Sequence, residues 1–219
     1  MVKQTPRIYV LAGTNGAGKS SIAGAMLIEQ GVEYFNPDAA AALIAEANPG
    51  IPLAEAQSAA WHQGRRLLER TIAERLQFAF ETTLGGTTIT ELLAEAIASG
   101  IELRILYVGL DTVERHIARV RARVETGGHD IPEEKIRERY VRSRLNLIRL
   151  MPKVTELRVY DNSKEADPRT TTSLSPRLLV HLDRGRLASV CELAATPDWA
   201  KPLVLTALKI SAGQSLTIK

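Results

Sequence analysis

Residues 13–20 form a complete phosphate-binding loop, Gly13-Thr14-Asn15-Gly16-Ala17-Gly18-Lys19-Ser20. Its three glycines allow backbone angles that side chains forbid, so successive N–H groups can curl around an anion. In such a loop Lys19 reaches the β- and γ-phosphates, and the hydroxyl of Ser20 ligates Mg²⁺. We therefore predict that ATP and Mg²⁺ are the cofactors, and that these residues together with Ser21 bind the nucleotide.

The segments on either side of the loop are those that nucleotide binding requires. The stretch Arg7–Ala12 just before it is typical of a buried strand, and Ser21–Glu29 just after it is typical of a helix. The positive end of that helix would lie behind the phosphates. A glycine-rich turn that matches by chance is the alternative, and the flanking strand and helix argue against it.

Phosphoryl transfer needs three further groups: a base for the acceptor, an anchor for the metal, and positive charge over the transferring phosphate. Asp38 follows a short predicted strand in Phe35-Asn36-Pro37-Asp38, where a parallel sheet places ligand-contacting residues. It is our candidate general base, because it can accept a hydroxyl proton and orient the acceptor. An equally supported alternative is that Asp38 caps a helix over residues 39–47.

Three residues at the end of another predicted strand are candidates for the metal and the acceptor. Glu81 ends the apolar run Phe78-Ala79-Phe80, and Thr82 and Thr83 follow it. Glu81 could hold Mg²⁺ together with Ser20, or hydrogen-bond the acceptor, and the two threonine hydroxyls could contact the acceptor. The alternatives are a solvent-exposed strand end and a cap for a helix that starts near Thr88.

Two arginines are our candidates for stabilising charge on the γ-phosphate. Arg123 and Arg139 each lie beside the apolar stripe of a predicted helix, so each could face a cleft. The alternative for either one is an ordinary solvated arginine. His129 lies in the loop between the two helices, where a contact with substrate is one interpretation and a surface position is the favoured one. The other three histidines show no metal-ligand spacing.

Strands and helices alternate along the chain, which predicts a parallel sheet flanked by helices. The predicted strands cover residues 7–12, 33–36, 77–81, 102–109 and 156–161, and the predicted helices between them cover 39–47, 53–75 and 88–98. The predicted fold class is therefore α/β, a three-layer sandwich of the P-loop NTPase type with a mostly parallel five-stranded sheet.

A helical lid is predicted over about residues 111–151. Val113, Ile117, Val120 and Val124 repeat at helical spacing, and two glycines then break this first helix before Pro132 begins a second. A helical hairpin between the last two sheet strands is how many P-loop kinases build a lid, which is an analogy.

The character of the sequence changes after Asn162. Residues 163–177 are rich in Ser, Thr, Pro and charge, and predict a loop. Two apolar runs, 178–182 and 187–190, flank a turn that contains Gly185, and predict a β-hairpin. We expect a kinase domain over residues 1–165 and an appendage over 166–219, in which the hairpin and Trp199 pack on the same domain.

Composition bounds the class of protein. The 219 residues are 45% hydrophobic and 24% charged, which is ordinary for a globular protein of one domain. No apolar run approaches the roughly 20 residues that span a membrane, and no secretory signal is visible. The single cysteine, Cys191, cannot form an internal disulfide. These features favour a cytoplasmic location without a membrane partner.

Positive charge is concentrated in one segment of the chain. Residues 104–149 carry eleven basic and seven acidic side chains, whereas residues 1–103 carry seven basic and eleven acidic ones. The guanidinium group of arginine suits phosphate oxygens. For most of these arginines, however, the favoured interpretation is a solvent-exposed helix face. Tyr140 is the one aromatic residue after Tyr107 in this segment, which is too few for base stacking and argues against a nucleic-acid partner.

Several segments in this order resemble the zeta-toxin family of P-loop kinases, in its shorter, single-domain branch. The similarity covers about residues 6–165, and the Glu-Thr-Thr-Leu and Gly-Gly-His-x-Ile-Pro segments are the most specific. The matching residues are Gly13–Ser20, Asn36-Pro37-Asp38, Phe80-Glu81-Thr82-Thr83-Leu84, Arg119-Val120, Arg123-Val124, Gly127-Gly128-His129-Asp130-Ile131-Pro132, Arg139-Tyr140, Arg142-Ser143, Asn146-Leu147 and Tyr160-Asp161-Asn162-Ser163.

The resemblance implies ATP-dependent phosphorylation of a sugar hydroxyl, with UDP-N-acetylglucosamine as the best-described acceptor. It implies that Lys19 and Ser20 bind the nucleotide and Mg²⁺, and that Asp38 is the general base. Glu81 and Thr83 would position the acceptor. The γ-phosphate would be neutralised by Arg123 and by an arginine of the second lid helix, for which we favour Arg139 over Arg137. Kinases of this family are often paired with an antitoxin protein, although nothing within this chain shows one.

Two other functions are compatible with the same residues. A kinase for the 5′-hydroxyl of a nucleic acid would use the same loop, an Asp base and arginines. An NTP-driven switch or mechanical ATPase is a third hypothesis, since Thr83-Leu84-Gly85-Gly86 is like part of a transporter-ATPase signature. That fragment lacks the glutamine that should follow and lies too early in the chain, so a small-molecule kinase is favoured.

Overall fold

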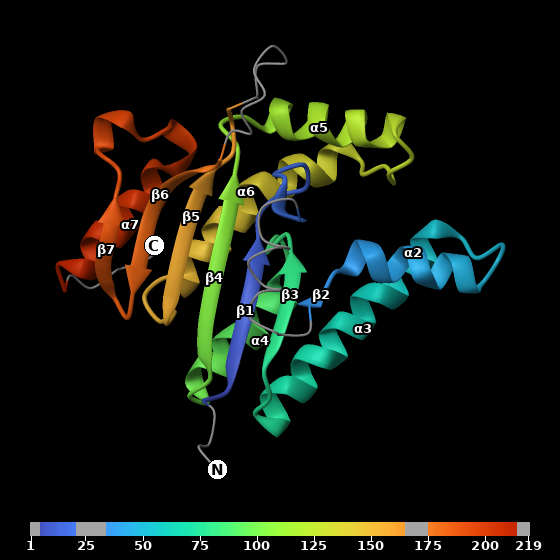
Figure 1. Ribbon diagram of the computed structural model, residues 1–219, viewed down its shortest axis with the longest axis horizontal. Helices are drawn as coiled ribbons and strands as arrows, with labels where there is room; N and C mark the ends of the chain where they lie inside the picture. The colour runs from blue at the N-terminus through green and yellow to red at the C-terminus, as the bar shows by residue number, and fades with distance from the viewer. Residues whose placement is uncertain (1–4, 21–33, 165–174, 214–219) are drawn as a thin grey trace.

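A mixed sheet organises the computed structural model, which describes residues 5–20, 34–164 and 175–213 (Figure 1). Its seven strands have the order β2-β3-β1-β4-β5-β6-β7. Their bounds are β1 (Arg7–Ala12), β2 (Tyr34–Phe35), β3 (Phe78–Thr82), β4 (Glu102–Gly109), β5 (Glu156–Asp161), β6 (Arg177–Asp183) and β7 (Arg186–Val190). The predicted α/β fold with a mostly parallel sheet and a C-terminal hairpin is confirmed.

The strand β1 lies in the interior of the sheet, between β3 and β4, and both pairings are parallel. Ile8, Leu11 and Ala12 are completely buried, as their apolar side chains favour. The outer pairs β2–β3 and β4–β5 are also parallel. All five strands therefore end at the same edge of the sheet, which is where open α/β sheets bind ligands.

Helices cover one face of the sheet and extend from its edge. They are α2 (Pro37–Ala47), α3 (Leu53–Glu74), α4 (Thr87–Ala98), α5 (Val113–Glu125), α6 (Glu133–Leu150) and α7 (Lys201–Ser211). In Figure 1, α4, α6 and α7 lie behind the strands, whereas the pair α2–α3 projects beside β2. The pair α5–α6 matches the predicted helical hairpin, and the predicted helix 21–29, with Ser21, lies outside the described residues.

The C-terminal hairpin extends the sheet instead of lying beside it. Antiparallel pairing joins β6 to β5 and β7 to β6, so the backbone groups at the edge of β5 have hydrogen-bond partners. Two short 3₁₀ turns, η1 (Leu193–Ala195) and η2 (Asp198–Ala200), then lead into α7, which the sequence did not predict. Trp199 packs on the domain as expected: it is buried, its indole covers Gly109, and its Nε1 donates to Asp161 Oδ1 at 3.2 Å.

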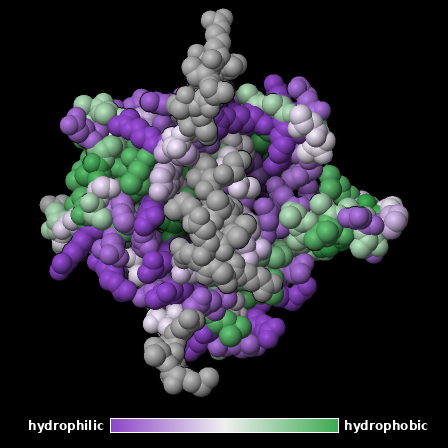
Figure 2. Space-filling model, viewed as in Figure 1, coloured by the Kyte–Doolittle hydropathy of each residue, from purple (hydrophilic) through white to green (hydrophobic). Residues whose placement is uncertain are grey.

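Some large hydrophobic side chains are exposed at the surface. Figure 2 shows them gathered over α2 and near the β6–β7 hairpin, with mostly hydrophilic side chains elsewhere on this face. The exposed large hydrophobic residues include Leu43 on α2 and Val190 on β7. Within the described part of the chain, no helix combines the length and apolar character needed to cross a membrane.

Candidate active site

The phosphate-binding loop follows β1 at the carboxyl edge of the sheet. Gly13 has φ +142°, and a Cβ atom there would stand 2.1 Å from the carbonyl oxygen of Val108, so only glycine fits. Thr14, Asn15 and Lys19 are buried. The loop is thus formed by local backbone geometry and by close contact with the neighbouring strand β4.

Side chains that are distant in sequence hold the loop in place through hydrogen bonds to its backbone oxygens. The Nδ1 atom of His116 on α5 donates to the backbone oxygen of Asn15 at 2.7 Å. Asn162, after β5, donates from Nδ2 to the oxygen of Ala17 at 2.9 Å, and Arg119 donates to the backbone oxygen of Asn162 at 3.0 Å. Spacing could not have revealed the role of His116, because 101 positions separate it from Asn15.

Acid should destabilise the fold through His116. Burial lowers the pKa of this side chain from 6.5 to about 4. Between these values the unfolded chain binds a proton that the folded chain does not, so stability falls as the pH is lowered through this window. We expect the loss attributable to His116 to total about 3 kcal/mol and to stop below pH ~4.

Urea unfolding measured at several pH values between about 7.5 and 4 checks this expectation. The variant His116→Gln keeps an N–H donor for Asn15 but cannot titrate, so this part of the pH dependence should vanish. Replacing His62, an exposed histidine on α3, in the same way should leave the pH dependence intact. An unchanged slope in His116→Gln would contradict the assignment.

Glu81, near the end of β3, joins the loop to the start of α2. Its carboxylate lies 3.3 Å from Lys19 Nζ and accepts hydrogen bonds from Ser20 Oγ at 2.9 Å, Tyr34 Oη at 2.8 Å and Asn36 Nδ2 at 3.3 Å. Burial is the larger cause and the negative charge of Glu81 the second cause of a raised pKa of the Tyr34 hydroxyl. This hydroxyl is therefore neutral and donates its hydrogen bond to Glu81. The sequence did not single out Tyr34 for this site.

Ser20 and Glu81 together fit a magnesium ion. Ser20 Oγ and Glu81 Oε2 are 2.9 Å apart and offer hard oxygen ligands. Mg²⁺ is usually held by one or two such groups together with water and substrate phosphates. The described residues form no cluster of three or more His, Cys, Asp or Glu side chains that could hold a metal without a substrate.

Asp38 lies in the first turn of α2 and faces α5 and the loop that follows it. The helix cap is Asn36, whose side chain accepts from the backbone N–H groups of Asp38 and Ala39 at 2.8 and 3.2 Å. The alternative role of Asp38 as the N-cap is therefore wrong. Its carboxylate lies 3.5 Å from Arg123 Nη1 and 3.7 Å from His129 Nε2. His129, expected at the surface, is only 20% exposed and lines the cavity.

Arg139 reaches the loop from α6. Its Nη1 donates to Asn15 Oδ1 at 2.9 Å, and its stem passes so close to Gly85 that a Cβ there would stand 2.8 Å from Arg139 Cγ. Burial lowers the pKa of this guanidinium, which stays charged because an arginine pKa is very high. Arg137, in contrast, points to Glu114 and Glu133 on the surface and does not line the cavity.

Thr82 and Thr83 line the cavity while also shaping the turn after β3. The hydroxyl oxygen of Thr82 accepts from Leu84 N at 3.0 Å, and that of Thr83 accepts from Gly85 N at 3.4 Å. Gly86 is the N-cap of α4 and no side chain caps this helix, so the alternative in which these threonines cap it is wrong.

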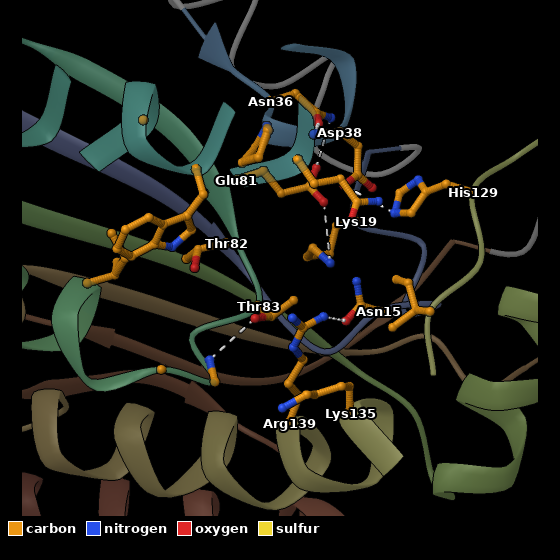
Figure 3. Close-up of a pocket in the computed structure, with 18 of the residues that line it drawn as sticks. Asn15, Lys19, Asn36, Asp38, Glu81, Thr82, Thr83, His129, Lys135 and Arg139 are labelled. Atoms are coloured by element: carbon orange, nitrogen blue, oxygen red, sulfur yellow. Dashed lines mark hydrogen bonds and ion pairs between the residues drawn. The ribbon is translucent and has the colours of Figure 1, made fainter. Parts of the chain in front are cut away.

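The candidate residues surround one cavity of about 1020 Å³. Figure 3 shows Lys19, Asp38 and Glu81 on one side of it and Arg139 on the other. Beyond the loop the cavity continues to Trp61 and Arg65 on α3, which sequence reasoning did not identify. There is therefore room for a second molecule next to a nucleotide bound by the loop.

Comparison with known proteins identifies similar chains. The family model for zeta toxin matches residues 2–168. An uncharacterized protein of Haemophilus influenzae (strain ATCC 51907 / DSM 11121 / KW20 / Rd) is 32% identical over 149 residues, which are 64% of this chain and 95% of that protein.

Solved structures share the fold. The native AvrRxo1-ORF1:-ORF2 complex matches with a TM-score of 0.65 and 15% identity over 94% of this chain, and the chain spans only 65% of that protein. The same pair of proteins solved with ATP matches with a TM-score of 0.61, 15% identity, and coverage of 98% and 66%. The PezAT chromosomal toxin-antitoxin system of Streptococcus pneumoniae matches with a TM-score of 0.54 and 16% identity over 80% of this chain and 77% of that one.

Proposed function

The chain belongs to the zeta toxin family, and from this membership we propose that it transfers the γ-phosphate of ATP to a hydroxyl group of a small molecule. That the protein is a kinase-type P-loop phosphotransferase follows from the family. Our candidate for the acceptor molecule is a nucleotide sugar such as UDP-N-acetylglucosamine.

The observation that carries the proposal is the convergence of Asp38, Arg123 and Arg139 on the cavity in front of the phosphate-binding loop. A base, a metal anchor and two guanidinium groups are the parts that phosphoryl transfer requires. An enzyme that only hydrolysed or sensed the nucleotide would not need the additional space that extends to Trp61.

The reaction would proceed by in-line displacement. Asp38 accepts the proton of the acceptor hydroxyl, whose oxygen forms a bond to the γ-phosphorus while the bond from that phosphorus to the bridging oxygen of ADP breaks. Lys19 and Arg123 exchange their partners Glu81 and Asp38 for phosphate oxygens, since a triphosphate carries the larger negative charge. Ser20 and Glu81 would hold Mg²⁺, which supplies charge neutralisation between the phosphates.

A protein partner is also proposed. PezAT is by name a toxin-antitoxin system, and the phosphotransferase described here would be held inactive by an antitoxin. Co-expression with the product of a neighbouring reading frame, followed by size-exclusion chromatography, tests for such a complex.

Incubation of the protein with MgATP and UDP-N-acetylglucosamine tests the acceptor. The expected product is a phosphorylated nucleotide sugar, detected by mass spectrometry, with one ADP formed for each phosphate transferred. A parallel reaction with an oligonucleotide that has a 5′-hydroxyl should show no transfer. Phosphorylation of the oligonucleotide alone, or ADP formation without transfer to any alcohol, would contradict the proposed acceptor class.

A further inference from the structure

Three side chains from separate elements meet at the wall of the cavity. Arg123 Nη1 lies 3.5 Å from Asp38 Oδ2, and His129 Nε2 lies 3.7 Å from Asp38 Oδ1, so each carboxylate oxygen has its own neighbour. Figure 3 shows the imidazole of His129 directed at Asp38. The proposed reaction gives roles to Asp38 and Arg123 but none to His129.

The loop between α5 and α6 is built to hold His129 in this position. Gly127 has φ +92°, and a Cβ on Gly128 would stand 2.6 Å from Arg123 Cγ, so the loop folds back closely over the end of α5. Arg123 Nη2 then donates to the backbone oxygen of His129 at 3.2 Å. The buried Ile131 anchors the following residues between the two lid helices. The segment Gly127-Gly128-His129 thus brings an imidazole to Asp38.

In the proposed reaction Arg123 turns from Asp38 to the γ-phosphate. If its guanidinium turns to the γ-phosphate, Asp38 loses the neighbour of Oδ2 and keeps His129 beside Oδ1. The imidazole faces Asp38 of α2, and Arg123 of α5 donates to the backbone oxygen of His129. Asp130 from the same loop and Lys135 and Arg139 from α6 line the same cavity. His129 is partly exposed, so it can exchange a proton with solvent.

We propose that His129 is a proton-relay residue that acts through Asp38, a role that rests on the proposed phosphotransferase function. Asp38 takes the proton from the acceptor hydroxyl as the new bond to phosphorus forms. In the imidazole tautomer that carries its proton on Nδ1, that proton then moves from the Asp38 carboxyl to His129 Nε2, and afterwards to water. Asp38 returns to the carboxylate form for the next turnover. The net result is the transfer of one proton from the acceptor hydroxyl to water.

The relay requires a neutral imidazole before each turnover. Removing the imidazole should therefore lower kcat, because Asp38 then loses its proton more slowly, and should leave ATP binding unchanged. A carboxylate that acted without a relay would keep its kcat when the imidazole is removed.

The experiment compares kcat and the KM for ATP of the wild-type protein and His129→Gln, with MgATP and UDP-N-acetylglucosamine and with ADP formation as the readout. We expect His129→Gln to have a several-fold lower kcat and to keep the wild-type KM for ATP. His181→Gln, in which the change lies on β6 beside Glu156, is the matched control and should keep the wild-type kcat and KM.

A chemical rescue separates the relay from a structural role. Added imidazole should restore kcat of His129→Gly several-fold, and His129→Asn replaces His129→Gln if the latter does not fold. A kcat in His129→Gln that equals the wild-type value overturns the relay, as does a loss that appears only in KM or that imidazole does not restore. If the wild-type protein transfers no phosphate, or if Asp38→Asn is fully active, the proposed function fails instead.

Discussion

Asp38→Asn is expected to lower kcat for phosphoryl transfer by about 10²–10⁴-fold, the range in which general bases contribute. The amide keeps the shape of the side chain but cannot accept the proton of the acceptor hydroxyl. Asp38 lies on α2, and its contacts among the described residues are with Asn36, Arg123 and His129. The dissociation constant of ATP should therefore not increase. Steady-state kinetics together with isothermal titration calorimetry for ATP measure both quantities.

The matched control is Asp198→Asn. Asp198 is an exposed carboxylate on η2 that pairs with Lys201, and its replacement should leave kcat within about twofold of the wild-type value. Transfer at the full rate in Asp38→Asn would remove the proposed base. A loss confined to ATP binding would mean that Asp38 shapes the nucleotide site and does not take part in the chemical step.

Arg139→Gln is expected to lower kcat by about 10³–10⁵-fold, the effect of an arginine that neutralises charge in the transition state of phosphoryl transfer. The guanidinium of Arg139 already lies over the phosphate-binding loop, 2.9 Å from Asn15 Oδ1, so a small movement brings it to the γ-phosphate. Arg139→Lys should recover only part of the activity, since an ammonium keeps the charge but not the planar fork. Single-turnover kinetics isolate this step from product release.

Arg137→Gln is the matched control on the same helix. Arg137 is 49% exposed and pairs with Glu114 and Glu133, and exposed pairs of this kind contribute at most about 1 kcal/mol to stability. The variant should keep kcat within about twofold of the wild type. Equal losses in Arg137→Gln and Arg139→Gln would show that the lid as a whole, and not one guanidinium, determines the rate.

The parts of the site that could be predicted are those encoded locally. A strand followed by a phosphate-binding loop has one physical arrangement, because the glycines and the adjacent backbone determine it. Asp38 and Glu81 could be placed together because parallel strands end at one edge of the sheet, and the structure has these strands in the expected positions. The catalytic roles of both residues, and a cytoplasmic location, stay predictions.

Two residues of the site that the sequence did not predict make their contacts across long sequence separations. Tyr34 donates to Glu81, 47 positions away, and His116 donates to the loop from a helix that begins about a hundred residues later. A single tyrosine or histidine carries no local pattern that distinguishes such a contact from ordinary packing. The helix α7 was missed because its apolar residues follow a segment without strand or helix periodicity.

The sequence by itself determined the phosphate-binding loop, the alternation of strands and helices, and the presence of a basic helical hairpin. Only the tertiary structure decided that Asn36 and not Asp38 caps α2, that Arg139 rather than Arg137 enters the cavity, and that the C-terminal hairpin continues the sheet. The reason is that local features depend on neighbouring backbone angles and residue spacing. Which side of a helix faces a cavity depends instead on how that helix packs against residues far along the chain.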